Sequence, residues 1–199
     1  MEATVTKKRG GKTKKIPEYL IYEMDEGKPI YYRGYKEYLQ GQRELEEIMS
    51  SSYLQSFLVS ELIQLLGKKL SHDYRILANE LGLQFKKKSW RAADIAIYKK
   101  ADLKNHPLDN KYLPIPPKIV IEVDTKASFE DFNTPMDYYT KKTDALLNFG
   151  VEKVIWIFTD AKKVMVAVKN TQWLIDDWTA DVEILENLSV NIEKLLKEA

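Results

Sequence analysis

Two short apolar runs decide the fold, AADIAIY at residues 92–98 and IVIEVD at residues 119–124. Each run has the length and the apolar content of a strand in a sheet that is covered on both faces. A carboxylate interrupts each run, Asp94 in the first and Glu122 in the second. Because side chains alternate between the two faces of a strand, each carboxylate shares a face with apolar residues of its own run.

These carboxylates predict a site for a divalent cation. A carboxylate taken out of water costs several kcal/mol unless a cation, a hydrogen-bond donor or a proton compensates it. Asp94 and Glu122 in neighbouring strands would repel each other, and a divalent cation between them would remove that repulsion. Mg²⁺ commonly binds one or two carboxylates together with waters and substrate phosphates. The two runs therefore point to a metal-dependent phosphodiester chemistry.

Length and composition indicate one globular domain. The chain has 199 residues, of which 44% are hydrophobic and 31% charged, and no cysteine. We expect a single domain over residues 16–199, preceded by a flexible basic arm at residues 1–15. No apolar run approaches the length of a membrane span, so we expect a cytoplasmic protein. The net charge is only +1, so nucleic-acid binding would need local basic patches.

The flanking sequence predicts helices and further strands around the two runs. A β-hairpin is expected around a turn at residues 25–27. Apolar spacing predicts one helix from about residue 51 to 70, and Asn133-Thr134-Pro135 opens another that ends at Phe149. Short strands are expected at residues 74–78, 81–87, 154–158 and 164–168, with an edge strand at 173–178 and a terminal helix at 191–198. Residues 99–117, rich in proline, are expected to form a long surface loop.

Several catalytic machineries are excluded by the residues present. The chain has no glycine-rich phosphate loop and no nucleophile-elbow context. Its only histidines, His72 and His106, are not in metal-ligand spacing, which argues against zinc and histidine-based nucleophile chemistry. Carboxylates and lysines remain, which are the residues used in metal-assisted hydrolysis.

Two lysines are candidates for that chemistry. Lys126 follows Asp124 in the pattern D-x-K, but it lies on the face of Glu122 only if the strand continues that far. Lys142 falls on an apolar stripe of the predicted helix that should face the sheet, so this lysine should need a buried anionic partner. Lys141 falls on a charged face of the same helix. Asp124 itself fits three roles: a metal ligand, a helix-side cap or a turn residue.

The order of these motifs resembles a known family. Ala93-Asp94, the strand IVIEV, Lys142 and the segment FGVEKVIW at 149–156 are similar to the Uma2 family of the PD-(D/E)XK nuclease superfamily. The similarity covers roughly residues 17–168. The sequence departs from the superfamily pattern at Ala93, where proline is usual, and at Asp124, where the literal motif has lysine.

The resemblance implies a restriction-endonuclease-like α/β core, a mixed β-sheet flanked by helices. It implies that Asp94 and Glu122 bind Mg²⁺ or Mn²⁺, and that a lysine positions the attacking water or neutralises the phosphate of a DNA substrate. Two alternatives stay open. In the first, the catalytic site is decayed and the nuclease-fold module only binds nucleic acid or a protein. In the second, the carboxylates form a structural ion pair with Arg91, Lys118 or Lys142.

A homodimer is a further expectation. The C-terminal region, which carries Trp156, Trp173 and Trp178, offers more apolar surface than a small core needs.

Overall fold

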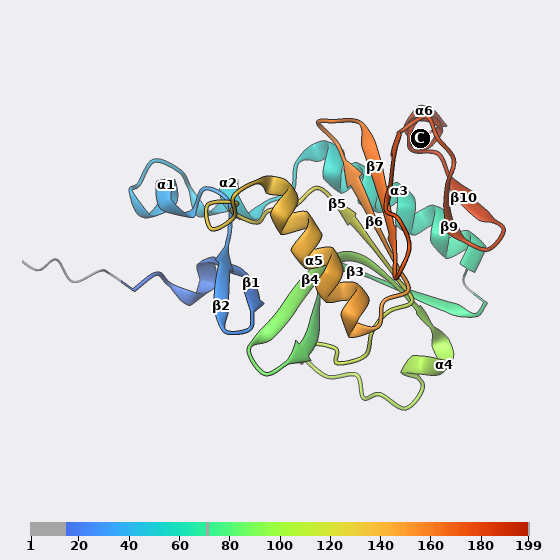
Figure 1. Cartoon of the computed structure of the whole chain (residues 1–199), viewed down its shortest axis with the longest axis horizontal. Helices are drawn as coiled ribbons and strands as arrows, with labels where there is room; N and C mark the ends of the chain where they lie inside the picture. Colours follow the sequence, from blue (N-terminus) through green and yellow to red (C-terminus); the bar gives the residue numbers. More distant parts are fainter. Residues whose placement is uncertain (1–14, 71, 199) are drawn as a thin grey trace, which may run out of the picture.

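The structure, a computed structural model, describes residues 15–70 and 72–198. Apart from its last residue, the predicted basic arm therefore lies outside the described residues. An eight-stranded mixed sheet forms the middle of the fold, and helices lie against both of its faces (Figure 1). The α/β class with a mixed sheet flanked by helices, which the sequence predicts, is confirmed. No helix within the described ranges has the length and apolarity needed to span a lipid bilayer.

The strand order places the two carboxylate-bearing strands side by side. The order is β2-β1-β4-β5-β6-β7-β8, with β3 paired to β4. β4 (Ser89–Lys99) and β5 (Ile119–Val123) are antiparallel, whereas β5 and β6 (Lys153–Phe158) are parallel. All other strand pairs in this sheet are antiparallel. The remaining strands of the sheet are β1 (Ile21–Asp25), β2 (Lys28–Tyr31), β3 (Tyr74–Lys86), β7 (Lys163–Val168) and β8 (Leu174–Asp177). The predicted N-terminal hairpin is β1–β2.

Helix α3 (Tyr53–Leu70) covers one face of the sheet, as the apolar spacing predicts. Its buried leucines recur every four residues, which keeps them on one side of the helix: Leu58, Leu62 and Leu66. They pack on isoleucines of β4 and β5, and the hairpin of β9 (Val182–Leu185) and β10 (Leu188–Val190) adds to the same core with α6 (Ile192–Glu198). The Ser52 hydroxyl accepts the backbone N–H of Gln55 at 3.2 Å and so caps α3.

Helix α5 (Pro135–Phe149) covers the other face and begins where the sequence predicts. Thr134 and Asp137 form a reciprocal capping box, with Pro135 in the first turn. The helix ends at Gly150, whose φ of 122° suits glycine. Trp156 is fully buried in this face, and Trp178 is buried in the other. Two of the three tryptophans that the sequence argument assigned to a dimer surface therefore belong to the core.

The structure corrects one predicted strand break. The expected strands at 74–78 and 81–87 are a single strand, β3, because a bulge carries the pairing past residues 79 and 80. Asn79 and Glu80 have φ values of 72° and 53°, and the register moves from Ala78 opposite Ile95 to Leu81 opposite Ala93. Short elements that the sequence did not predict are η1 (Glu18–Leu20), α1 (Tyr35–Leu39), α2 (Leu45–Met49), α4 (Lys100–Leu103) and the β9–β10 hairpin.

Candidate functional site

Asp94 and Glu122 occupy matching positions on adjacent strands. Ile95 pairs with Ile121, so the next position along this antiparallel register holds Asp94 and Glu122. Asp94 Oδ2 accepts the backbone N–H of Val123 at 2.8 Å, which fixes the carboxylate at the end of β5. The bulge of β3 lies opposite Asp94, and bulges commonly redirect side chains beside functional sites. The structure thus brings the two predicted carboxylates together.

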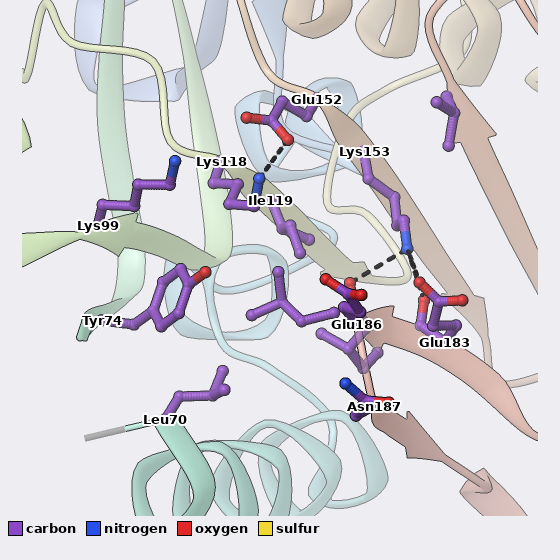
Figure 2. Close-up of a pocket in the computed structure, with 13 residues that line it drawn as sticks. Leu70, Tyr74, Lys99, Lys118, Ile119, Glu152, Lys153, Glu183, Glu186 and Asn187 are labelled. Carbon is purple, nitrogen blue, oxygen red and sulfur yellow. Dashed lines mark hydrogen bonds and ion pairs between the residues drawn. The ribbon is translucent and has the colours of Figure 1, made fainter. Parts of the chain in front are cut away.

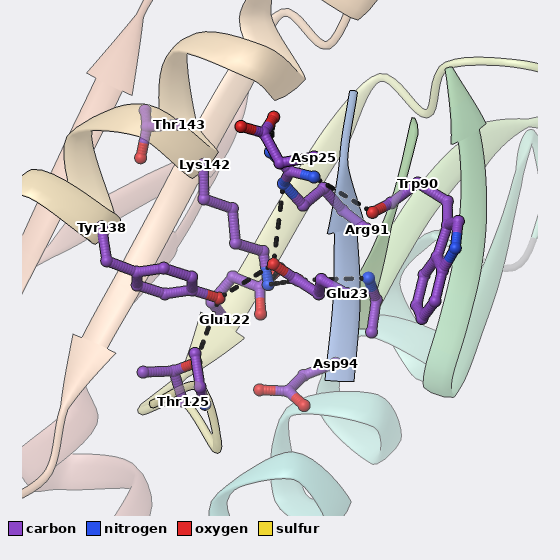
Figure 3. Close-up of polar contacts among 12 residues, drawn as sticks. Glu23, Asp25, Trp90, Arg91, Asp94, Glu122, Thr125, Tyr138, Lys142 and Thr143 are labelled. Atoms are coloured by element: carbon purple, nitrogen blue, oxygen red, sulfur yellow. Dashed lines mark hydrogen bonds and ion pairs between the residues drawn. The ribbon is translucent and has the colours of Figure 1, made fainter. Parts of the chain in front are cut away.

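Lys142 lies inside the same cluster. Its Nζ atom is 3.0 Å from Glu122 Oε1 and 2.9 Å from Glu23 Oε1, and these three side chains are 0–1% exposed. Figure 3 shows the lysine reaching from α5 to the two carboxylates. By contrast, Lys141 is half exposed and pairs with Asp25 at 2.6 Å. The prediction that Lys142 faces the sheet and meets a buried anion is confirmed.

Sequence reasoning missed Glu23. The hydroxyl of Tyr138 donates to Glu23 Oε2 at 3.1 Å, and the backbone N–H of Ala92 donates to Oε1 at 3.2 Å. Arg91 lies between Glu23 and Asp25, with its Nη2 2.6 Å from Asp25 Oδ1. A signal was present, because Glu23 interrupts an apolar stretch of β1 as Glu122 interrupts that of β5.

Burial and charge perturb the titration of the cluster. Burial raises the pKa of Glu122 well above its usual range, and the ammonium of Lys142 only partly opposes this. Burial also raises the pKa of Asp94, against the hydrogen bond from Val123. For Lys142, burial lowers the pKa, but the carboxylates of Glu122 and Glu23 outweigh it and hold the pKa well above its usual value. Lys142 therefore stays protonated.

Asp124 takes the turn role among the three that the sequence left open. Its backbone φ is 57°, which ends β5. Its two carboxylate oxygens accept the backbone N–H and the hydroxyl of Thr159, at 2.9 and 2.6 Å. Asp124 thereby ties the end of β5 to the residue after β6.

Lys126 lies beside Asp94 rather than in the buried cluster. Because β5 ends at Val123, the strand does not carry Lys126 onto the face of Glu122. Lys126 pairs with Glu80 at the bulge, and both line a hollow of about 560 Å³ together with Asp94. Polar residues of α3 and the preceding segment line the same hollow: Ser51, Gln55, Ser56 and Ser60. Asp94 is among the residues that line this hollow, whereas the fully buried Glu122 is not.

A hollow at the other end of β5 is a weaker candidate. This hollow has a volume of about 470 Å³. Figure 2 shows two ion pairs in its lining, Lys118 with Glu152 and Lys153 with Glu183. Glu152 and Glu183 are 60% and 64% exposed, so these are surface ion pairs of low energetic weight. Lys118 is thus paired away from both Asp94 and Glu122.

The donor set fits a hard divalent cation that takes most of its ligands from water and substrate. Neither carboxylate oxygen of Glu122 nor the Nζ atom of Lys142 takes part in a well-aligned hydrogen bond, so both groups keep hydrogen-bonding or coordinating capacity for a ligand. Across residues 15–70 and 72–198, no group of three or more His, Cys, Asp or Glu side chains is arranged to hold a metal ion. Two carboxylates suffice for Mg²⁺, which keeps several waters and uses phosphate oxygens.

The mixed sheet, its helices and the carboxylate–lysine cluster define a protein of the nuclease-fold class. The chain belongs to the Uma2 family, whose model, described as "Putative restriction endonuclease", matches residues 16–193. The fold is similar to that of a crystal structure from Anabaena variabilis ATCC 29413 described as "a putative nuclease belonging to DUF820". That similarity has a TM-score of 0.65 at 19% identity and covers 88% of this chain and 89% of the other. No curated protein matches the chain significantly.

Proposed function

We propose that this chain is an endonuclease that hydrolyses phosphodiester bonds in DNA with Mg²⁺ or Mn²⁺ as its cofactor. The observation that carries the proposal is the contact of buried Lys142 with Glu122, next to Asp94, in a chain of the Uma2 family. Strongly perturbed ionisable groups beside a hollow are typical of catalytic sites.

Asp94 and Glu122 are the residues that would hold the metal ion. When bound, the ion would supply an activated water and neutralise charge on the scissile phosphate. The backbone N–H of Val123 keeps Asp94 oriented, which leaves its other oxygen for a ligand. Glu122 is held by Lys142, whose ammonium group offsets part of the repulsion between Glu122 and the neighbouring acidic side chains.

The lysines have different roles in this proposal. Lys142 stays protonated between two carboxylates, so it can orient a water or a phosphate oxygen but cannot act as a base. Lys126 faces the hollow, where an incoming phosphate would compete with Glu80 for its ammonium group. Asp124 contributes indirectly, because its contacts with Thr159 set the direction in which the chain carries Lys126.

The alternative is a nuclease-fold module that binds nucleic acid or a protein partner without cutting. One observation favours it: Lys142 already neutralises part of the charge of Glu122 and Glu23, so the buried cluster is stable in the absence of a metal ion. The sequence also has Asp124 at the position where the literal motif has lysine, and this departure favours the binding module as well.

Plasmid cleavage separates the two functions. The wild-type protein is incubated with supercoiled DNA in Mg²⁺, in Mn²⁺ or in EDTA, and the nicked and linear products are measured. Nicking that requires the metal and is lost in Glu122→Gln supports the endonuclease. DNA retention in a gel-shift assay, without nicking in either metal, supports the binding module instead.

A further inference from the structure

The buried Lys142 has two carboxylate partners, Glu122 and Glu23. Only Glu122 belongs to the pair of carboxylates, Asp94 and Glu122, that would hold the metal ion. The other, Glu23, comes from the N-terminal hairpin and contacts Lys142 Nζ at 2.9 Å, a distance similar to the 3.0 Å of Glu122. We propose that Glu23 is a positioning residue, which fixes the ammonium group of Lys142 beside Glu122. This inference rests on the proposed endonuclease function.

Both carboxylate oxygens of Glu23 are already engaged inside the protein, unlike those of Glu122. Its Oε1 accepts the backbone N–H of Ala92 and contacts Lys142, and its Oε2 accepts the hydroxyl of Tyr138. An effect of Glu23 on a reaction must therefore pass through the groups it contacts. Lys142 is the one among them that also contacts Glu122.

Glu23 is itself held rigidly, as a positioning residue must be. The hydroxyl of Tyr138 donates a hydrogen bond to Oε2 of Glu23, and the backbone N–H of Ala92 donates one to Oε1. The guanidinium of Arg91 adds positive charge, with its Nε 3.6 Å from Glu23 Oε2. These contacts come from α5 and β4, so the carboxylate is fixed from two sides.

Lys142 needs such a partner because its side chain is long and flexible. A lysine side chain has many rotamers, so one carboxylate alone fixes it loosely. In the structure, Glu23 and Glu122 hold the ammonium group between them, and the rings of Tyr22 and Trp156 lie 5.8 and 5.3 Å from Nζ. Four side chains thus define the position of one cation.

The residues that directly follow the hairpin contact the segment that carries Lys126. The side chain of Arg33 donates to the carbonyl of Thr125 at 2.8 Å, and the backbone N–H of Arg33 donates to the carbonyl of Lys126 at 2.7 Å. Tyr32 forms a β-bridge with Ala127. The N-terminal hairpin and the residues that follow it therefore contact the surroundings of both candidate lysines.

A purely structural role for Glu23 predicts a different result from a positioning role. Asp25 is the matched control, because it lies on the same strand and binds the same Arg91, but pairs with half-exposed Lys141 instead of Lys142. Loss of either charge weakens the Arg91 network, and only loss of Glu23 releases Lys142. Tyr138→Phe is a second, milder variant, since it removes one donor to Glu23 while keeping the ring.

The test measures kcat and KM for DNA cleavage in Mg²⁺ for the wild type, Glu23→Gln, Asp25→Asn and Tyr138→Phe. We expect kcat to fall about tenfold or more in Glu23→Gln, with KM nearly unchanged, because small displacements of a catalytic group cost up to about a hundredfold. Tyr138→Phe should lower kcat to a smaller extent, and Asp25→Asn should retain it.

The outcomes distinguish failure of the positioning role of Glu23 from failure of the proposed endonuclease function. Equal kcat in Glu23→Gln and Asp25→Asn would overturn the positioning role and leave the endonuclease intact. If Glu23→Gln does not fold, an unchanged kcat in Tyr138→Phe overturns it. A wild type that cleaves no DNA in either metal would overturn the proposed function, and the role of Glu23 with it.

Discussion

Lys142 Nζ lies 3.0 Å from Glu122 Oε1, and both side chains are 1% exposed. The pair joins helix α5 to strand β5 across one face of the sheet, and Glu23 of β1 contacts the same ammonium group. The two strands and the helix are thereby linked through one buried cation. Removal of that cation leaves the buried Glu122 without a compensating charge, and it leaves Glu23 with Arg91 alone.

The three lysines should differ in cleavage. Lys142→Ala should abolish metal-dependent nicking, Lys126→Ala should reduce it, and Lys141→Ala should be nearly silent. Lys142 contacts Glu122, Lys126 lies beside Asp94, and Lys141 pairs with Asp25 at the surface. A nicking assay on the three purified, folded variants checks this. Full activity in Lys142→Ala together with loss in Lys126→Ala would reverse the assignment.

Substitution of a buried lysine should lower the free energy of unfolding more than substitution of an exposed one. Lys142→Met should destabilise the fold by about 3–5 kcal/mol, because it leaves the buried carboxylate of Glu122 without its cation. Lys141→Met should change the free energy of unfolding by less than about 1 kcal/mol, because an exposed pair contributes little. Urea unfolding followed by circular dichroism measures both. Equal effects of the two substitutions would contradict the buried ion pair.

Asp25 should make stability depend on pH. Burial works against its charge, but hydrogen bonds from Lys141 and Arg91 outweigh it and hold the pKa of Asp25 below its ordinary value. A depressed pKa adds stability above the unfolded-state pKa of about 3.9, and this contribution is lost as pH falls through the folded-state pKa. Asp25→Asn should therefore be less stable than the wild type at pH 7, and the difference should shrink below about pH 4. A constant difference in unfolding free energy from pH 7 to pH 3 would contradict it.

A homodimer would use the edge strand β8. All four of its residues are exposed, and Leu174 and Ile175 are 60% and 55% exposed. Exposed apolar edge strands readily pair with another chain. We expect a dimer in sedimentation velocity at high micromolar concentration, and a monomer for the double variant Leu174→Lys, Ile175→Lys. A wild type that sediments as a monomer would rule out this association.

Local patterns were sufficient to predict the core of the site. Strand alternation identified Asp94 and Glu122, and helical spacing separated Lys142 from Lys141, because both patterns depend only on neighbouring residues. The start of α5 was predictable for the same reason, since Thr134 and Asp137 cap their own helix.

Contacts between distant segments were not predictable in this way. Glu23 joins the cluster only because β1 pairs beside β4, and its own hairpin gave no sign of which lysine it would meet. The position of Lys126 depends on the turn at Asp124, which Thr159 fixes from the end of another strand. The bulge at Asn79 and Glu80 requires left-handed backbone that neither residue type demands.

The central claim is that Asp94 and Glu122 bind one divalent cation. Isothermal titration calorimetry with Mn²⁺ and with Mg²⁺ tests it most directly, on the wild type, on Asp94→Ala and on Asp144→Asn, whose carboxylate is exposed on the outer side of α5. We expect a single binding event in the wild type and in Asp144→Asn, and its loss in Asp94→Ala. Identical binding by the wild type and Asp94→Ala would contradict it.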